Sequence, residues 1–297
     1  EVHAVARQPL TVSIAAPVQW HQVDLLDATA LPQVLRTVSP THLLHLAWVA
    51  TPGVFWNSPE NTQWVEASVQ LLREFAAQRG RRIVMAGTCA EFDWSALQGP
   101  CGDHTPCRPN SLYGASKNAL RLALHAYARQ YGLSAAWGRI FLLYGPHEHP
   151  KRLVPSVIRG LLRREEVACT HGAQQRDFMH VQDAAHAFVA LLESDVQGDM
   201  SIGTGAGVPV RDVVTHVAQS MHGLDLIELG SLPTPAHEPP YLVADVTRQR
   251  VEVGFTPRWG LADGLADTIA WWRSELAEDV GAVKDEGGKH LAALNHA

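Results

Sequence analysis

Three residues between positions 88 and 117 carry side chains suited to proton transfer. Thr88 follows an apolar run, and Tyr113 and Lys117 come later with four-residue spacing. Residues four apart lie on one face of a helix, so this spacing would make the phenol and the ammonium neighbours. Because an ammonium beside a phenol stabilises phenolate, we expect the pKa of Tyr113 to fall toward neutrality.

This set of side chains suits the oxidation or reduction of a carbinol. The Thr88 hydroxyl could orient a substrate oxygen, and Tyr113 could donate or accept its proton while a neighbouring nicotinamide moves a hydride. Ordinary amphipathic helices often contain a Tyr and a Lys four apart, so a surface pair is the alternative for these two residues. A strand-end cap is the alternative for Thr88. The position of the pair after a strand that ends in Thr88 strengthens the catalytic interpretation.

Short apolar segments alternate with longer amphipathic ones, which is typical of βαβ units and a parallel sheet. The expected strands are 2–6, 18–23, 42–47, 83–86 and 135–141. Helices are expected at 59–79, which starts at a proline and stops before Gly80, and at 112–131, which is closed by Gly132. After residue 146 the pattern is looser. The expected helices there are 153–164, 183–193, 210–222 and 262–276, and the expected strands are 167–169 and 200–203.

Composition excludes several classes of partner. The chain has 297 residues and 46% hydrophobic content, enough for one large domain or two closely joined ones. The net charge is −6 with scattered basic residues, and no apolar run approaches the ~20 residues of a membrane helix. We therefore expect neither a nucleic-acid nor a membrane partner.

Cysteine and histidine positions argue against a metal site. The four cysteines lack zinc-like spacing and suggest a reducing cytoplasm, with free thiols favoured over a Cys101–Cys107 pair. The segment from His147 to His149 lacks the helical spacing of a zinc motif.

The beginning of the chain lacks the glycine-rich turn that opens a dinucleotide-binding fold. We expect about one strand–turn–helix to be missing there, on the order of 30 residues. The glycines at 203, 205 and 207 come too late for phosphate binding and are interpreted as a turn before a helix.

The order of several further motifs resembles the NAD-dependent epimerase/dehydratase branch of the extended short-chain dehydrogenases/reductases. The motifs are His45-Leu46-Ala47, Leu71-Leu72, Thr88 with Tyr113 and Lys117, Arg139 with Tyr144-Gly145-Pro146, Leu153-Val154-Pro155, the segment 176–181 with Asp183, Ile202-Gly203-Thr204-Gly205, and Asp245 with Gly254-Phe255-Thr256-Pro257. The similarity covers about residues 1–276.

The resemblance implies an α/β fold: a Rossmann-type doubly wound parallel sheet with a smaller C-terminal α/β substrate domain. It assigns residues 1–145 and 179–204 to the NAD(P)-binding domain and 146–178 and 205–278 to a nucleotide-sugar domain. The segment 279–297 is polar, Gly-rich and unpatterned, so we expect it to be a frayed tail. The resemblance also implies a homodimer formed through the helices 59–79 and 112–131.

The resemblance further assigns roles to single residues. Thr88, Tyr113 and Lys117 would be catalytic. The residues expected at the cofactor are Arg7, Asp24, Leu25, Leu46, Ala47, Tyr113 and Lys117. The residues expected at the nucleoside-diphosphate sugar are Thr88, Val154 and Arg176. Arg7 stands where an acid would hold the ribose of NAD, so it slightly favours NADP, although a solvated arginine is equally expected. The alternatives are a helix cap for Asp24 and a salt bridge to Asp177 or Asp183 for Arg176.

Departures from the family pattern narrow the expected reaction. Dehydratases of the family carry an Asp-Glu pair directly after the catalytic threonine, whereas this chain has Cys89 and Ala90. Leu142 and Leu143 precede Tyr144 where an asparagine is common, and Trp64 replaces another asparagine. Trp48, Trp56 and Trp64 are expected in the core or the pocket wall.

We therefore expect a 4-keto sugar reductase or a C4 epimerase and not a dehydratase. One alternative is a catalytically idle NADP-binding regulator of the same fold. A second alternative, which applies if the chain truly begins at residue 1, is a defective fragment.

Overall fold

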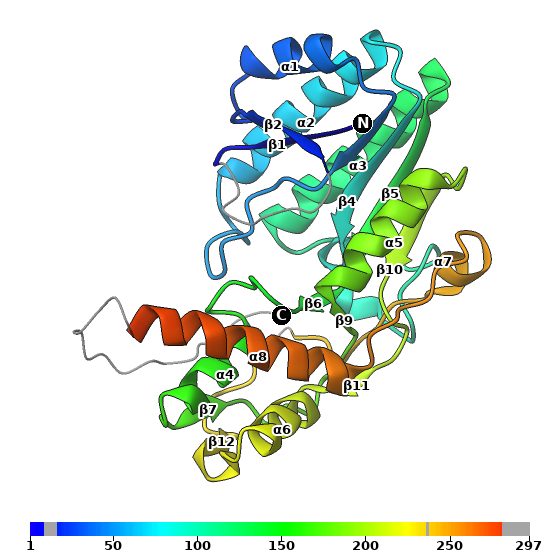
Figure 1. Cartoon of the computed structure of the whole chain (residues 1–297). Coiled ribbons are helices and arrows are strands. Elements are labelled where there is room, and N and C mark those ends of the chain that lie inside the picture. The colour runs from blue at the N-terminus through cyan, green and yellow to red at the C-terminus, as the bar shows by residue number, and fades with distance from the viewer. Residues whose placement is uncertain (9–16, 236–237, 281–297) are drawn as a thin grey trace.

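The computed structural model describes residues 1–8, 17–235 and 238–280, and a four-stranded parallel sheet forms its centre (Figure 1). The strand order is β10, β5, β4, β3. The strands are β3 (His42–His45), β4 (Arg82–Thr88), β5 (Ser134–Ile140) and β10 (Gly198–Ile202). A second parallel pair, β1 (Val2–Ala6) and β2 (Val18–Gln22), forms its own sheet, and no ladder within the described residues joins β1 to β3. The predicted parallel pairing is confirmed.

Helices cover both faces of the main sheet. Helices α2 (Glu60–Ala77) and α3 (Leu112–Tyr131) pack on one face, and α5 (Val181–Glu193) packs on the other. Side chains alternate along β4 because strand residues point to opposite faces in turn. Ile83 and Met85 join the α2–α3 side, and Val84 and Ala86 join the α5 side. Both sides are thus filled by apolar side chains, and the central strands are buried.

A second packed region lies below the sheet in Figure 1. Its helices α4 (Leu153–Leu162), α6 (Val210–Ser220) and α8 (Leu261–Val280) enclose one apolar cluster. Its short strands are β6 (Leu142–Tyr144) with β9 (Phe178–His180), β7 (Val167–Cys169) with β12 (Ile227–Leu229), and β8 (Gln175–Arg176) between β11 (Val208–Pro209) and β13 (Tyr241–Leu242). Helix α7 (Thr247–Val251) contacts β10. The division into two domains at the stated residues remains a prediction.

Boundaries expected from sequence agree with the structure where capping is strong. The helix 112–131 is confirmed to the residue, and Gly132 closes it with a φ of 66°. Helix α1 (Ala30–Val38), which has Pro32 in its first turn, was not predicted. The expected frayed tail is wrong at residues 279 and 280, which belong to α8, and its remainder, 281–297, lies outside the described residues.

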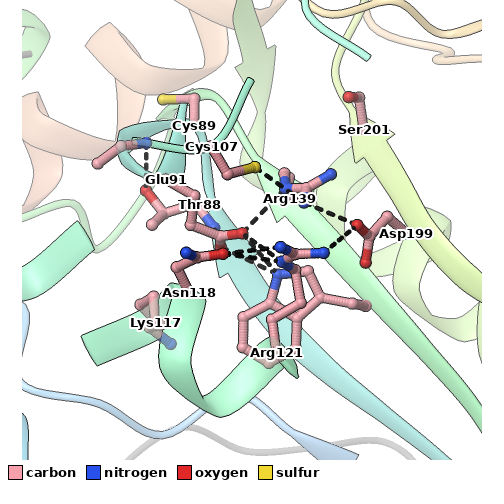
Figure 2. A network of polar contacts seen from close by, with 12 residues as sticks. Thr88, Cys89, Glu91, Cys107, Lys117, Asn118, Arg121, Arg139, Asp199 and Ser201 are labelled. Atoms are coloured by element: carbon pink, nitrogen blue, oxygen red, sulfur yellow. Dashed lines mark hydrogen bonds and ion pairs between the residues drawn. The ribbon is translucent and has the colours of Figure 1, made fainter. Parts of the chain in front are cut away.

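A buried carboxylate, Glu91, joins the end of β4 to β5 (Figure 2). Glu91 has no exposed surface. It accepts hydrogen bonds from the backbone N–H of Thr88 (2.8 Å), the indole N–H of Trp137 (2.9 Å) and Nε of Arg139 (2.9 Å). Burial raises the pKa of Glu91, and the guanidinium of Arg139 opposes that effect. The carboxylate therefore depends on its donors to be tolerated inside the protein.

The network continues from Arg139 to β10 and α3. Arg139 donates to Asp199 Oδ2 at 2.8 Å, and Arg121 of α3 donates to the same oxygen at 2.7 Å. His125 lies 2.6 Å from the other oxygen. Burial alone would raise the pKa of Asp199, but these three partners outweigh it and lower the pKa to about 2. Three strands and a helix are thereby tied together at the end of β4.

We predict that Glu91→Ala lowers the free energy of unfolding by about 3–5 kcal/mol, the usual cost of leaving a buried partner charge unpaired. Urea unfolding followed by circular dichroism measures this change. The matched control is Glu252→Ala, because Glu252 pairs with Arg248 at an exposed site. That variant should lose at most about 1 kcal/mol. Equal losses in the two variants would contradict the importance of the buried pair.

Candidate active site

Thr88 begins the site at the last residue of β4, where it is 8% exposed. Its Oγ1 accepts from the backbone N–H of Ala90 at 3.2 Å, while Glu91 accepts from the backbone N–H of Thr88. This reciprocal capping box turns the chain into a 3-10 helix, Cys89–Glu91. The pattern of a threonine followed three residues later by a glutamate could have indicated Glu91 from sequence.

Backbone contacts bring Tyr113 next to Thr88. Ser111 caps α3 by accepting from the backbone N–H of Gly114, and the backbone N–H of Tyr113 donates to the carbonyl of Trp56 at 3.0 Å. A Cβ at Gly114 would lie 2.3 Å from the carbonyl oxygen of Ala90. Glycine therefore permits α3 to touch the turn that follows Thr88.

The pKa of Tyr113 shifts in the direction opposite to the one that the sequence predicts. Burial raises it to about 12, and the hydrogen bond with the Thr88 side chain opposes that shift only in part. The expected fall toward neutrality is wrong because removal from water dominates over any neighbouring charge. Tyr113 is therefore a protonated phenol at neutral pH.

Lys117 lies on the same helix as Tyr113 but directs its ammonium to the end of β4. Nζ donates to the carbonyl of Ala86 at 2.9 Å and lies 4.0 Å from the ring centroid of Trp48. Burial lowers the pKa of Lys117 to about 7, and the charge of Glu91 opposes this in part. The lysine is thus close to losing its charge at neutral pH.

A cleft of about 1010 Å³ collects many of the expected residues. It is lined by Thr88, Tyr113, Lys117, Leu46 and Val154 among others. Val154 is buried on α4, so the cleft extends from the main sheet to the second packed region.

The three tryptophans that the sequence places in the core or the pocket wall are found there. Trp48 and Trp56 line the cleft, and Trp64 is buried and stacks on Trp48 with ring centroids 6.0 Å apart.

The other expected cofactor residues lie at the carboxyl ends of neighbouring strands, outside the cleft lining. Arg7 follows β1, and Asp24 and Leu25 come soon after β2. Ala47 follows β3 and is half-buried, as is Leu25, whereas Arg7 and Asp24 are exposed. Asp24 accepts from the backbone N–H of Leu26 at 3.0 Å, which is a turn and not a cap of α1. Carboxyl ends of parallel strands are where such folds bind ligands, so these roles stay predictions.

Arg176 is not placed on the cleft. It is 1% exposed, donates to Glu238 at 2.7 Å and donates to the carbonyls of Gln175 and Pro239 at 2.8 Å each. Its salt-bridge partner is Glu238, which does line the cleft, and not Asp177 or Asp183. Two of its three guanidinium nitrogens are thus engaged inside the protein, while Nε has no hydrogen-bond partner within the described residues, and the expected contact with a substrate phosphate stays a prediction.

Several cleft residues were not indicated by the sequence pattern. The edge of Phe55 meets Tyr113 at 4.8 Å between ring centroids, and Arg152 lies over the Phe55 ring at 5.3 Å. Glu148 also lines the cleft, and burial raises its pKa to about 8 against the opposing charge of Arg152. These residues come from loops without periodic patterns, so position in the fold alone reveals them.

Three findings concern the part of the chain that the structure describes. All four cysteines are free thiols, which agrees with the expectation. No group of three or more His, Cys, Asp or Glu side chains in that part could hold a metal ion. None of its helices is both long enough and apolar enough to cross a membrane.

Comparisons with known proteins give relatives of several activities. The chain is 31% identical over 214 residues to a dTDP-glucose 4,6-dehydratase of Streptomyces niveus. The matched region covers 70% of this chain and 62% of the relative. It is 24% identical over 285 residues to UDP-glucuronate 4-epimerase 4 of Arabidopsis thaliana. That match covers 88% of this chain and 64% of the relative. The chain thus spans less than two thirds of the length of these curated relatives.

A solved structure covers more of the chain. MoeE5 in complex with UDP-glucose and NAD is 30% identical, has a TM-score of 0.78, and is matched over 93% of this chain and 91% of its own. This similarity confirms the expected Rossmann-type α/β fold. The model of the NAD-dependent epimerase/dehydratase family matches residues 1–203. The chain therefore belongs to the NAD-dependent epimerase/dehydratase family, whose members are enzymes of the extended short-chain dehydrogenase/reductase type.

Proposed function

We propose that this enzyme carries out hydride-transfer chemistry at C4 of a nucleoside-diphosphate hexose, as a 4-keto reductase in preference to a 4-epimerase. The observation that carries the proposal is the pairing of Thr88 with Tyr113 in the cleft. Thr88 would orient the oxygen at C4, and Tyr113 would exchange a proton with it. The roles that the sequence predicts for the individual site residues are part of the same proposal.

The protonation state of Tyr113 supports reduction. A phenol with a pKa of about 12 holds its proton at neutral pH and is ready to donate it to the oxygen of a ketone. Oxidation of a hydroxyl, the first half of an epimerase cycle, would instead require Tyr113 to accept a proton. Burial therefore favours the direction in which the tyrosine acts as the acid.

The chain offers donors for a nicotinamide cofactor, which when bound would supply or accept the hydride at C4. Lys117 fits the ribose of such a cofactor, since its ammonium has three protons and lies on the cleft wall with one bond to Ala86. The remainder of the cofactor would be contacted by Arg7, Asp24, Leu25, Leu46 and Ala47. Arg7 favours NADP, whereas MoeE5 contains NAD, so we propose NAD(P) without narrowing it further.

The proposed class of substrate rests on the ligands of a similar solved structure and on the presence of the cleft. MoeE5 binds UDP-glucose and UDP-glucuronic acid, which makes UDP-sugars the first ligands to test.

We also propose a cytoplasmic homodimer formed through α2 and α3. The exposed Leu122 and Tyr131 of α3, 55% and 65% accessible, would be covered in such a dimer.

Dehydration is disfavoured by the residues that follow Thr88. Burial raises the pKa of the Cys89 thiol to about 12, so it cannot act as a base at neutral pH, and Ala90 has no ionisable group. Elimination of water needs both an acid and a base beside the sugar.

One observation favours the catalytically idle regulator. The ammonium of Lys117 is engaged by the carbonyl of Ala86 and the ring of Trp48, which leaves it fewer contacts to offer a cofactor. Steady-state turnover separates the two proposals. The protein is supplied with UDP- and dTDP-4-keto-hexoses and NAD(P)H, and with UDP-glucose and NAD. Products are followed by NMR. Consumption of NAD(P)H supports the reductase, interconversion of gluco and galacto forms supports the epimerase, and release of a 4-keto-6-deoxy sugar from a glucose substrate contradicts both.

We predict that Tyr113→Phe lowers kcat by ~100-fold or more, the scale of a lost general acid. The cofactor dissociation constant should stay nearly unchanged, because only the hydroxyl is removed. The control is Tyr241→Phe, at a tyrosine of β13 that does not line the cleft, and this variant should keep wild-type turnover. Wild-type kcat in Tyr113→Phe would remove this residue from the mechanism.

We predict that cofactor affinity weakens as the pH rises through about 7, because Lys117 loses its proton there. Arginine keeps its charge at all these pH values, so Lys117→Arg should remove the pH dependence even if its affinity is lower. Fluorescence titration with NADPH and NADH between pH 6 and 9 measures the effect. Lys151→Arg, at an exposed residue of the same cleft, is the control and should keep the wild-type profile. A flat wild-type profile would count against the role of Lys117.

A further inference from the structure

The indole ring of Trp48 lies over the ammonium group of Lys117. Nζ of Lys117 is 4.0 Å from the centroid of the ring, well within the ~6 Å over which an aromatic face attracts a cation. The same nitrogen donates to the carbonyl of Ala86 at 2.9 Å. The ammonium therefore has two separate attachments, and both Trp48 and Lys117 line the cleft.

Two contacts fix the orientation of the Trp48 ring. Its indole N–H donates to Asn61 Oδ1 at 2.8 Å, and the ring stacks on Trp64 with an interplanar angle of 29°. Asn61 is buried and donates in turn to the carbonyls of Phe55 and Ser58 at 2.7 and 2.9 Å. The polar edge of the indole is thus satisfied by a rigid partner, and its electron-rich face is held where it meets a cation.

The titratable groups that face Lys117 from other elements are Glu91, in the 3-10 helix after β4, and His45, at the end of β3. Glu91 favours the charged lysine but is already paired with Arg139 at 2.9 Å. Burial, together with the charge of Lys117, lowers the pKa of His45 to about 3, so the imidazole is neutral. Tyr113, on the same helix as the lysine, is a neutral phenol at neutral pH. Since burial lowers the pKa of Lys117 to about 7, its charge depends on each favourable contact.

We propose that Trp48 is a positioning residue for Lys117, whose ammonium it holds at the cleft wall in the charged form. The face of an indole ring attracts a cation through its quadrupole and has no such attraction for a neutral amine. The contact therefore stabilises one protonation state of Lys117 and works against the desolvation that favours the other. Its consequence for cofactor binding rests on the proposed function, in which Lys117 contacts the cofactor ribose. On that basis, Trp48 extends to higher pH the range in which the cofactor binds.

Direct titration of Lys117 tests the contact without any ligand. The chain has only four lysines, Lys117, Lys151, Lys284 and Lys289, so the full chain labelled with carbon-13 lysine gives few NMR signals, and Lys117→Arg identifies the one that belongs to Lys117. The wild-type protein is compared with a protein that carries tetrafluorotryptophan at position 48, introduced by amber suppression. Fluorine withdraws electron density from the ring but leaves its shape and its N–H group in place. We expect the fluorinated ring to lower the measured pKa of Lys117 by about 0.4–1.5. An unchanged or higher pKa would overturn the proposal.

The matched control places the same fluorinated residue at position 94. Trp94 lines the same cleft, and its indole N–H is also satisfied, by the carbonyl of Cys89 at 3.1 Å. Its ring meets that of Trp56, with centroids 6.0 Å apart, and within the described residues it makes no cation–π contact with Lys117. The control should keep the wild-type pKa of Lys117. A decrease of the same size in both proteins would overturn the assignment to Trp48.

Cofactor titration separates this proposal from the proposed function. NADH and NADPH are titrated into the wild-type protein and the protein fluorinated at position 48 across the same pH range. If Lys117 contacts the cofactor, the pH at which affinity falls should decrease by as much as the pKa of Lys117. If that pKa decreases but affinity is independent of pH in both proteins, Trp48 positions Lys117 as proposed and the cofactor role of Lys117 is wrong. If affinity depends on pH but its profile does not move with the pKa, the link from Trp48 to cofactor binding is overturned.

Discussion

The buried pairing of Glu91 with Arg139 is the interaction on which the arrangement of the site depends. One carboxylate fixes the backbone of Thr88, and its guanidinium partner reaches β10 and, through Asp199, helix α3. Charges so deep in a protein are tolerated only with good geometry on every side. The position of Thr88 is therefore coupled to the packing of three strands and the helix that carries Tyr113 and Lys117.

Desolvation sets the chemistry of the same site. Burial raises the pKa of Tyr113 and lowers that of Lys117, so both side chains are driven toward their neutral forms. A neutral phenol is a proton donor, and a lysine near its titration point responds to small changes in pH. At neutral pH the site therefore presents a tyrosine that can donate its proton.

How much the sequence could predict depended on the range of the interactions. The limits of α3 followed from local caps at Ser111 and Gly132, and the parallel sheet followed from its apolar runs, so both were predictable. The membership of Thr88, Tyr113 and Lys117 in one cleft followed from motif order. The salt bridge of Arg176 with Glu238 and the shift of Tyr113 could not be predicted, because both depend on burial and on residues distant in the sequence. Helix α1 was missed because Pro32 weakened its pattern.

The close approach of α3 to the carbonyl of Ala90 separates two properties that enzymes often have to change together. Because Gly114 leaves no room for a side chain, the distance between the tyrosine and the strand end is set by backbone contact. Side chains around the cleft can then be exchanged without moving Thr88 and Tyr113 apart. A protein built in this way can change which ligand its cleft accepts by single substitutions in the cleft wall while the arrangement of Thr88 and Tyr113 stays the same, so laboratory evolution of its selectivity could begin from that wall alone.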